Sequence, residues 1–135
     1  MKNTFGSALC LTIFGESHGA GVGAVLDGMA AGVPVDPASL AALMDKRRAR
    51  GDGLSTARVE ADEVRILSGV VNGRTTGTPL TLLIENHNTR SGDYAATAAL
   101  LRPGHADYTA YARYRGWQDA RGGGHFSGRI TAGLV

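Results

Sequence analysis

The sequence predicts an α+β fold made of sandwich-like layers of antiparallel sheet and helices. Strand-like and helix-like segments are mixed along the chain, without the regular alternation that a doubly wound parallel sheet requires. Glycine is frequent, at 20 of 135 residues, whereas aromatic residues make up only 6%. This composition is typical of a chain with many turns and close backbone approaches, and it argues against a helical bundle.

The N-terminal part is expected to contribute two strands. Residues 8–14 form the first, because Leu9, Leu11 and Ile13 alternate with their neighbours and share one face. A glycine-rich turn follows, and then a second strand at residues 24–27.

A helix is expected to begin at Asp36 and Pro37, since Asp is a favoured N-cap and Pro is favoured at the first helical position. Leu40, Leu43 and Met44 lie on one side of this helix, which ends in a basic run.

The second half is expected to hold two more strands and a helix. Residues 64–71 and 78–84 are strand-like, with an Asn72-Gly73 turn signal between them. A helix is predicted over about residues 106–115, where three tyrosines recur at helical spacing and a glycine follows the end. A last helix is predicted to open at Ser127.

Composition limits the function classes. The chain is long enough for one domain, and its 43% hydrophobic content suffices for a core. The net charge of +2 does not indicate a nucleic-acid partner. A single cysteine, Cys10, excludes an internal disulfide and fits a reducing compartment. With no signal peptide and no run of the ~20 apolar residues that a membrane helix needs, we expect a soluble cytoplasmic protein without a membrane partner.

Three glycine-flanked tracts each contain a histidine: residues 15–19, 102–109 and 121–129. A turn needs glycine, but nothing in a turn requires histidine. Because histidine changes its charge near neutral pH, the three tracts indicate one assembled site that handles anions and protons.

In the first tract, His18 is a candidate proton donor, and Ser17 and Glu16 are candidates to orient it. The alternative is a hairpin turn with a solvent-facing histidine, and the local pattern gives both interpretations about even odds.

The cluster at residues 46–50 places four cations in five positions at a helix end. Taken alone, it favours a solvated helix terminus that complements the helix dipole. Binding of phosphate or carboxylate is the functional alternative, since guanidinium groups hold such anions bidentately. A nucleic-acid contact is a third option, although no aromatic residues are interleaved.

The second and third tracts also leave alternatives. Asp107 can cap the backbone or hold His105, and residues 121–129 suit either a phosphate group at the start of a helix or a flexible linker. No pair of the four histidines has metal-ligand spacing, so no metal site is expected.

Together the tracts resemble the chorismate synthase family. The resemblance covers essentially the whole chain and rests on several motifs in register. They are Gly15-Glu16-Ser17-His18-Gly19 followed by Asp27-Gly28, Ile66-Leu67-Ser68-Gly69, Thr75-Thr76-Gly77-Thr78-Pro79, Thr89-Arg90-Ser91, the RPGHADYT segment at 102–109, and the glycine-rich segment at 121–129 in its GGGHFSGR form.

The resemblance implies a lyase that removes phosphate and a ring proton from 5-enolpyruvylshikimate-3-phosphate in a 1,4-elimination, giving chorismate. Reduced FMN is required although no net redox change occurs, and whether NADPH reduces that flavin stays open. The family also implies a homo-oligomer, a homotetramer at full length. An alternative is a flavin- or anion-binding fragment without turnover.

The resemblance also implies roles for single residues. Catalytic roles fall on His18, His105 and Ser17. The cofactor-binding positions are Arg47, His125, Phe126 and Ser127. The positions implied to bind substrate are Arg48, Arg102 and Arg129.

Some features depart from the family pattern. Its members are more than twice as long, so we expect residues 1–135 to be a truncated N-terminal portion of a single domain, inactive and prone to associate when isolated. Residues 50–54 are shorter than usual, which leaves one arginine of some members without a counterpart. His87 stands where a hydroxyl residue is common.

Overall fold

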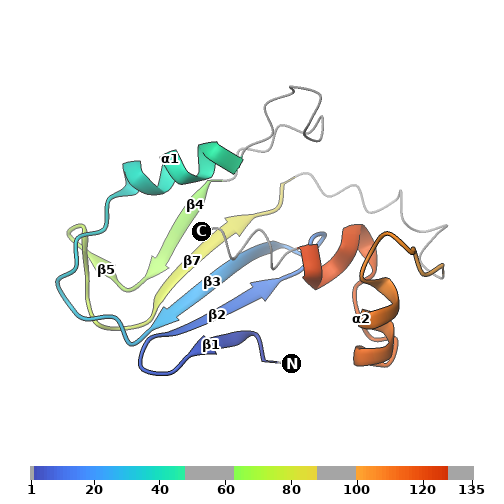
Figure 1. The fold of residues 1–135 in the computed structure, drawn as a ribbon. Coiled ribbons are helices and arrows are strands. Elements are labelled where there is room, and N and C mark those ends of the chain that lie inside the picture. The colour runs from blue at the N-terminus through green and yellow to red at the C-terminus, as the bar shows by residue number, and fades with distance from the viewer. Residues whose placement is uncertain (1, 48–62, 88–99, 128–135) are drawn as a thin grey trace.

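The computed structural model describes residues 2–47, 63–87 and 100–127, without the side chains of residues 46 and 47. Its main feature is a five-stranded antiparallel sheet in the order β1-β2-β3-β7-β4 (Figure 1). The strands are β1 (Thr4–Gly6), β2 (Cys10–Gly15), β3 (Gly21–Asp27), β4 (Val64–Ser68) and β7 (Leu80–Glu85). A separate two-stranded ribbon joins β5 (Val70–Val71) to β6 (Arg74–Thr75). The α+β class with an antiparallel sheet is therefore confirmed.

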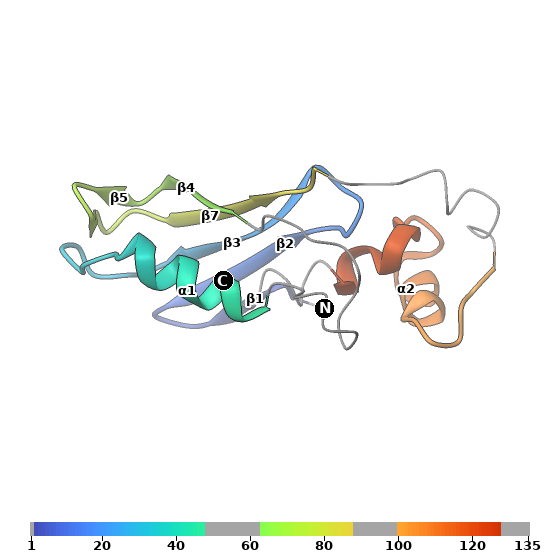
Figure 2. The ribbon, with the colours of Figure 1, turned by 90° about the horizontal axis from the view of Figure 1, so that it is seen from above.

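The core lies between the sheet and the helix α1 (Pro37–Arg47), which runs across one sheet face (Figures 1 and 2). Opposed residues of neighbouring strands share that face, as Ile13 does with Ala24 and Val22 with Ile84. Met44 of α1 joins these four side chains in one buried cluster.

The helix α1 begins as predicted. The carboxylate of Asp36 accepts hydrogen bonds from the amide of Ala38 at 3.0 Å and from the hydroxyl of Ser39 at 2.6 Å. The Ser39 hydroxyl bond is the main reason that the pKa of Asp36 lies below its ordinary value. Of the expected apolar side, Met44 is 3% exposed but Leu43 is 50% exposed, so Met44 carries the main contact with the sheet.

The predicted strands are present, with shifted boundaries. Leu9 lies just before β2 and is exposed, while Leu11 and Ile13 pack in or against the core. The strand β1 was missed, and it pairs with β2 through Phe5 opposite Leu11. The turn signal at Asn72 is confirmed, because that residue has φ 49° and starts the reversal between β5 and β6.

Beyond one end of the sheet lies α2 (Asp107–Tyr114), followed by a 3-10 turn at Arg121–Gly123 (Figures 1 and 2). The helix buries Asp107 and Ala110 and leaves Tyr108 and Tyr111 exposed.

Residues 124–127 are helical, so the helix predicted to open at Ser127 already begins three residues earlier. Within the described ranges, no helix combines the length and apolar character that crossing a membrane requires.

Candidate functional site

The first and third histidine tracts are joined directly at the end of β2. The amide of Ser17 donates a hydrogen bond to the carbonyl of Gly124 at 3.0 Å. The Nδ1 atom of His125 lies 2.7 Å from the carbonyl of Gly15 and must donate to it, because a carbonyl only accepts. Two adjacent residues of the glycine-rich segment are thus bonded to the loop that carries Ser17.

The second tract is bonded through Arg102 to the chain just before the glycine-rich segment. Its Nε atom donates to Asp107 Oδ2 at 2.7 Å, and its Nη2 atom donates both to Asp107 Oδ1 at 3.0 Å and to the carbonyl of Ala120 at 2.9 Å. The Asp107 carboxylate also accepts a hydrogen bond from the backbone amide of Arg102 at 2.9 Å. It therefore caps a backbone group, as one of the sequence alternatives expected, and holds the Arg102 side chain as well. This pair ties the start of α2 to Ala120, two residues before the glycine run.

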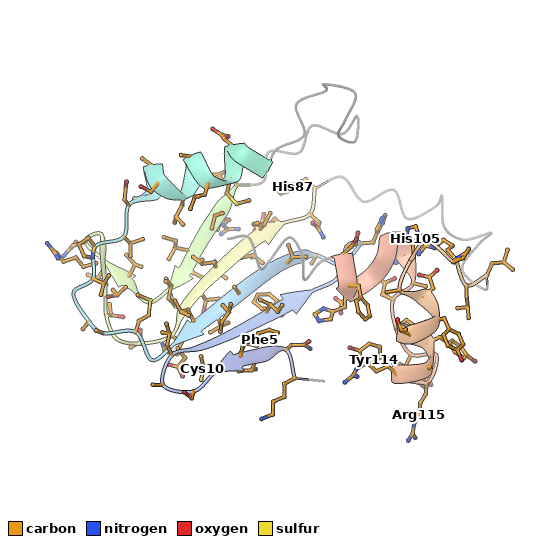
Figure 3. The ribbon with its side chains drawn as sticks, viewed as in Figure 1. Phe5, Cys10, His87, His105, Tyr114 and Arg115 are labelled. Atoms are coloured by element: carbon orange, nitrogen blue, oxygen red, sulfur yellow. The ribbon has the colours of Figure 1, made fainter. Side chains whose placement is uncertain are left out.

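His18 and His105 lie next to two consecutive glycines. His18 is 8% exposed, and a Cβ atom added to Gly122 would lie 2.6 Å from its Nε2 atom and 2.7 Å from the hydroxyl of Ser17. A Cβ atom on Gly123 would lie 3.9 Å from the His105 ring. Since successive Cα atoms are about 3.8 Å apart, both imidazoles belong to one small site. Figure 3 shows His105 just before α2.

Two aspartates supply negative charge beside these histidines. Asp119 accepts bonds from the Nε atom of Arg121 at 2.8 Å and from its Nη2 atom at 2.6 Å. The Arg121 bond, and to a smaller degree the charge of His18, holds the pKa of Asp119 below its ordinary value. The pKa of Asp107 is lowered in the same way, chiefly by Arg102 and partly by His105.

A pocket of about 410 Å³ lies between the end of β2, the helix α2 and the segment before residue 127. Aromatic walls come from Phe14, Tyr114, Trp117 and Phe126, and Asp119 and His125 are among its polar groups. Among the described residues, its lining contains no lysine or arginine. The pocket therefore suits a flat aromatic ring with hydrogen-bonding edges better than a phosphate group.

The predicted anion ligands fall mostly outside the described part of the chain. Arg48 and Arg129 lie beyond it, and Arg47 ends α1 with its side chain outside the description. The fourth histidine, His87, does not join the others: it follows β7, its side chain is 76% exposed, and it lies 3.7 Å from the Glu85 carboxylate. In the described ranges, no group of three or more His, Cys, Asp or Glu side chains is arranged to hold a metal ion.

Sequence reasoning missed Asn86, which shapes the first tract. Its side-chain amide donates to the carbonyls of Ser17 at 3.2 Å and Gly19 at 2.9 Å, and a third carbonyl, of Glu16, lies at 3.3 Å. It also missed Asp119. No local pattern marks either residue, because their partners are distant in sequence or lie in a turn without a distinctive motif.

Known proteins resemble this chain along its whole length. The family model described as chorismate synthase matches residues 9–135. Curated relatives named chorismate synthase include that of Dehalococcoides mccartyi, 47% identical over 135 residues, or 100% of this chain and 37% of the relative. That of Campylobacter fetus is 53% identical over 130 residues, or 96% of this chain and 36% of the relative.

A solved structure supports the same relationship. The protein titled "Crystal Structure of Chorismate Synthase" is 31% identical, with a TM-score of 0.52 over 79% of this chain and 25% of that one. The chain thus spans little more than a third of the length of the curated relatives. Because the family model matches nearly every residue, the chain belongs to the chorismate synthase family.

Proposed function

We propose that the protein carrying this chain is a lyase that converts 5-enolpyruvylshikimate-3-phosphate to chorismate. In this 1,4-elimination, a ring proton is removed and the electrons of its C–H bond form a new ring double bond. The existing ring double bond shifts by one position, and the carbon–oxygen bond breaks so that its electrons leave with phosphate. The observation that carries the proposal is the position of His18 and His105 against the consecutive glycines Gly122 and Gly123. Two titratable rings in one small site suit a reaction that must both release phosphate and move a proton.

His18 is the group proposed to assist the departing phosphate. It is buried, and its ring lies against the backbone of Gly122 next to the Ser17 hydroxyl, which suits a proton donor held in one position. Ser17 is proposed to relay protons, because its hydroxyl and the His18 Nε2 atom both lie close to the backbone of Gly122.

The pocket next to the histidines is proposed to hold the ring of reduced FMN. Phe126 and His125 would contact the ring from the glycine-rich segment, and Ser127 lies close to Gly123 on the same segment. Reduced flavin supplies electron density to the substrate, and His105 is proposed to keep the flavin in the required protonation state.

The anionic groups of substrate and cofactor need cations that the pocket lining does not provide. We propose Arg47 for the phosphate of FMN, and Arg48 and Arg129 for the substrate. Arg102 is proposed to attract the anionic substrate mainly through its positive charge. The ion pair with Asp107 weakens this attraction. The protein is further proposed to be a cytoplasmic homotetramer, with neither nucleic acid nor membrane as a partner.

The test is anaerobic turnover of the complete gene product with reduced FMN. His18→Ala and His105→Ala are each expected to lower turnover by about two or more orders of magnitude, as for acid–base residues. His87→Ala is the matched control and is expected to leave turnover unchanged, because His87 is exposed and outside the site.

Wild-type turnover in either of the first two variants would contradict the proposed roles. Binding of FMN without any turnover by the unaltered protein would favour a flavin-binding module. Steep salt-dependent binding of oligonucleotides would instead favour the nucleic-acid interpretation of the basic cluster at residues 46–50.

A further inference from the structure

We propose that Asn86 is a positioning residue for His18: its side-chain amide binds the backbone on both sides of His18 and so fixes where the imidazole lies. The proposal rests on the function proposed above. It assigns a role to a residue that lies outside all three histidine tracts.

The first support is that Asn86 extends from a rigid part of the sheet. It directly follows β7, which lies between β3 and β4 in the five-stranded sheet. The last residue of β7, Glu85, is paired with Gly21 of β3. The backbone amide of Asn86 continues this ladder by donating to the carbonyl of Ala20 at 3.0 Å. Because this bond uses only backbone atoms, it is kept when the Asn86 side chain is changed.

The second support is the set of bonds that the Asn86 side chain makes. Its Nδ2 atom lies 3.2 Å from the carbonyl of Ser17 and 2.9 Å from that of Gly19. The carbonyl of Glu16 lies at 3.3 Å and also accepts the amide of Gly19 at 3.0 Å. All three partners are carbonyls, so only the NH₂ end of the side chain can face them. One amide group therefore binds the backbone of the whole turn.

These bonds act directly on the backbone around His18. The Ser17 carbonyl belongs to the peptide bond that enters His18, and the Gly19 carbonyl lies one residue beyond it. From the other side, the amide of Ser17 donates to the carbonyl of Gly124 at 3.0 Å. The loop that carries His18 is thus clamped between the end of β7 and the glycine-rich segment, at the end of the sheet that faces α2 (Figures 1 and 2).

A fixed backbone fixes the imidazole, because the direction of the Cα–Cβ bond and the staggered rotamers leave a side chain few positions. His18 is 8% exposed, and a Cβ atom added to Gly122 would lie 2.6 Å from its Nε2 atom. The ring therefore has little room, and a shift of the loop must change its distance to the groups that it serves.

Thr75 provides a matched control at the opposite end of β3. Its hydroxyl donates to the carbonyl of Ala30 at 2.6 Å and accepts the amide of Val33 at 3.0 Å. These residues follow β3, whereas the loop of His18 precedes it. Thr75→Val therefore removes side-chain bonds to a loop backbone, as a change of Asn86 does, but leaves the loop of His18 intact.

The experiment measures anaerobic turnover of the complete protein under conditions where circular dichroism shows each variant to be folded. Asn86→Ala is expected to lower kcat by about 10- to 100-fold, since a displacement of about 1 Å of a catalytic group costs roughly 100-fold. KM for the substrate should change far less, because no bond to substrate is removed. Asn86→Gln, which keeps the amide on a longer side chain, should recover part of kcat. Thr75→Val should unfold at lower urea concentration and keep its kcat.

A double mutant tests whether Asn86 acts through His18. In the His18→Ala background, Asn86→Ala is expected to cause no further loss of the residual kcat, because the ring that Asn86 positions is gone. The same fold-loss in both backgrounds would overturn the proposal, and so would an unchanged kcat in folded Asn86→Ala.

A second readout does not depend on turnover. In NMR spectra of ¹⁵N-histidine-labelled protein, the ring resonances of His18, assigned with His18→Ala, are expected to move in Asn86→Ala and to stay in place in Thr75→Val. Unmoved resonances in folded Asn86→Ala would refute the positioning role. If Asn86→Ala does not fold, Asn86→Ser, which retains one donor, carries the same tests. Moved resonances combined with full activity of His18→Ala would contradict the proposed function and leave the positioning of the ring intact.

Discussion

A methyl group at position 122 would occupy space that the His18 ring and the Ser17 hydroxyl already use. The added Cβ would lie 2.6 Å from His18 Nε2 and 2.7 Å from Ser17 Oγ, whereas ordinary contacts of a Cβ atom begin near 3.4 Å. The Cδ2 atom of the same ring would lie closer still, so in Gly122→Ala the ring must retreat by about 1 Å. A displacement of about 1 Å of a catalytic group costs roughly 100-fold in rate, so we expect turnover to fall by about that factor.

Backbone strain is the competing explanation, and a second glycine separates the two effects. Gly122 has φ 60°, and a non-glycine residue in this left-handed region costs about 1–2 kcal/mol. Gly32 has φ 86° with no heavy atom within 4 Å of an added Cβ, so Gly32→Ala carries strain without a collision. We expect both variants to lose stability by urea unfolding, but only Gly122→Ala to lose anaerobic turnover. Equal turnover in both variants and the unaltered protein would refute the placement of His18 in the site.

Two further predictions concern stability. Met44→Ala is expected to destabilise the protein by about 2–5 kcal/mol in urea unfolding, because Met44 is the buried contact of α1. Leu43 is next to it but half exposed, so Leu43→Ala should lower the free energy of unfolding far less. Equal decreases in the two variants would contradict the packing described. The Arg102–Asp107 pair should make the free energy of unfolding depend on pH, because the pKa of Asp107 is lowered in the folded state. The stabilisation by ionised Asp107 is complete above its ordinary pKa of 3.8 and is lost as pH falls through the lowered pKa. Asp107→Asn should therefore be less stable than the unaltered protein at neutral pH and show a smaller further loss below pH 3.8, and parallel pH profiles would contradict the pairing.

Much of the fold could be predicted because the signals are local. Alternation marked β2, and Asp36 with Pro37 marked the start of α1, since a cap and a first-turn proline act within a few residues. The strand β1 was missed because three exposed residues, Thr4–Gly6, give no alternation to detect. The early start of the last helical turn was missed because three glycines are a poor helix signal.

The sequence singled out His18 and His105, which the structure brings next to consecutive glycines, but it did not indicate their partners. His18 and His105 stood out because glycine turns have no structural need for imidazole. Which acid lies beside which base depends on the path of the chain between the tracts, and short-range spacing does not encode that path. Asp107 illustrates this point: its sequence position suggested a contact with the backbone, which is present at the Arg102 amide, but not the ion pair with the Arg102 side chain.

The bond between His125 and Gly15 also has a consequence for the order of folding. It connects residues 110 positions apart, so the loop that it closes contains nearly the whole chain described. Closing so long a loop is entropically costly and slow compared with forming the adjacent β2–β3 hairpin. During synthesis, the loop that carries His18 therefore cannot form this bond until His125 has left the ribosome. We infer that the sheet forms first and that the arrangement of the two histidines is among the last native features to appear.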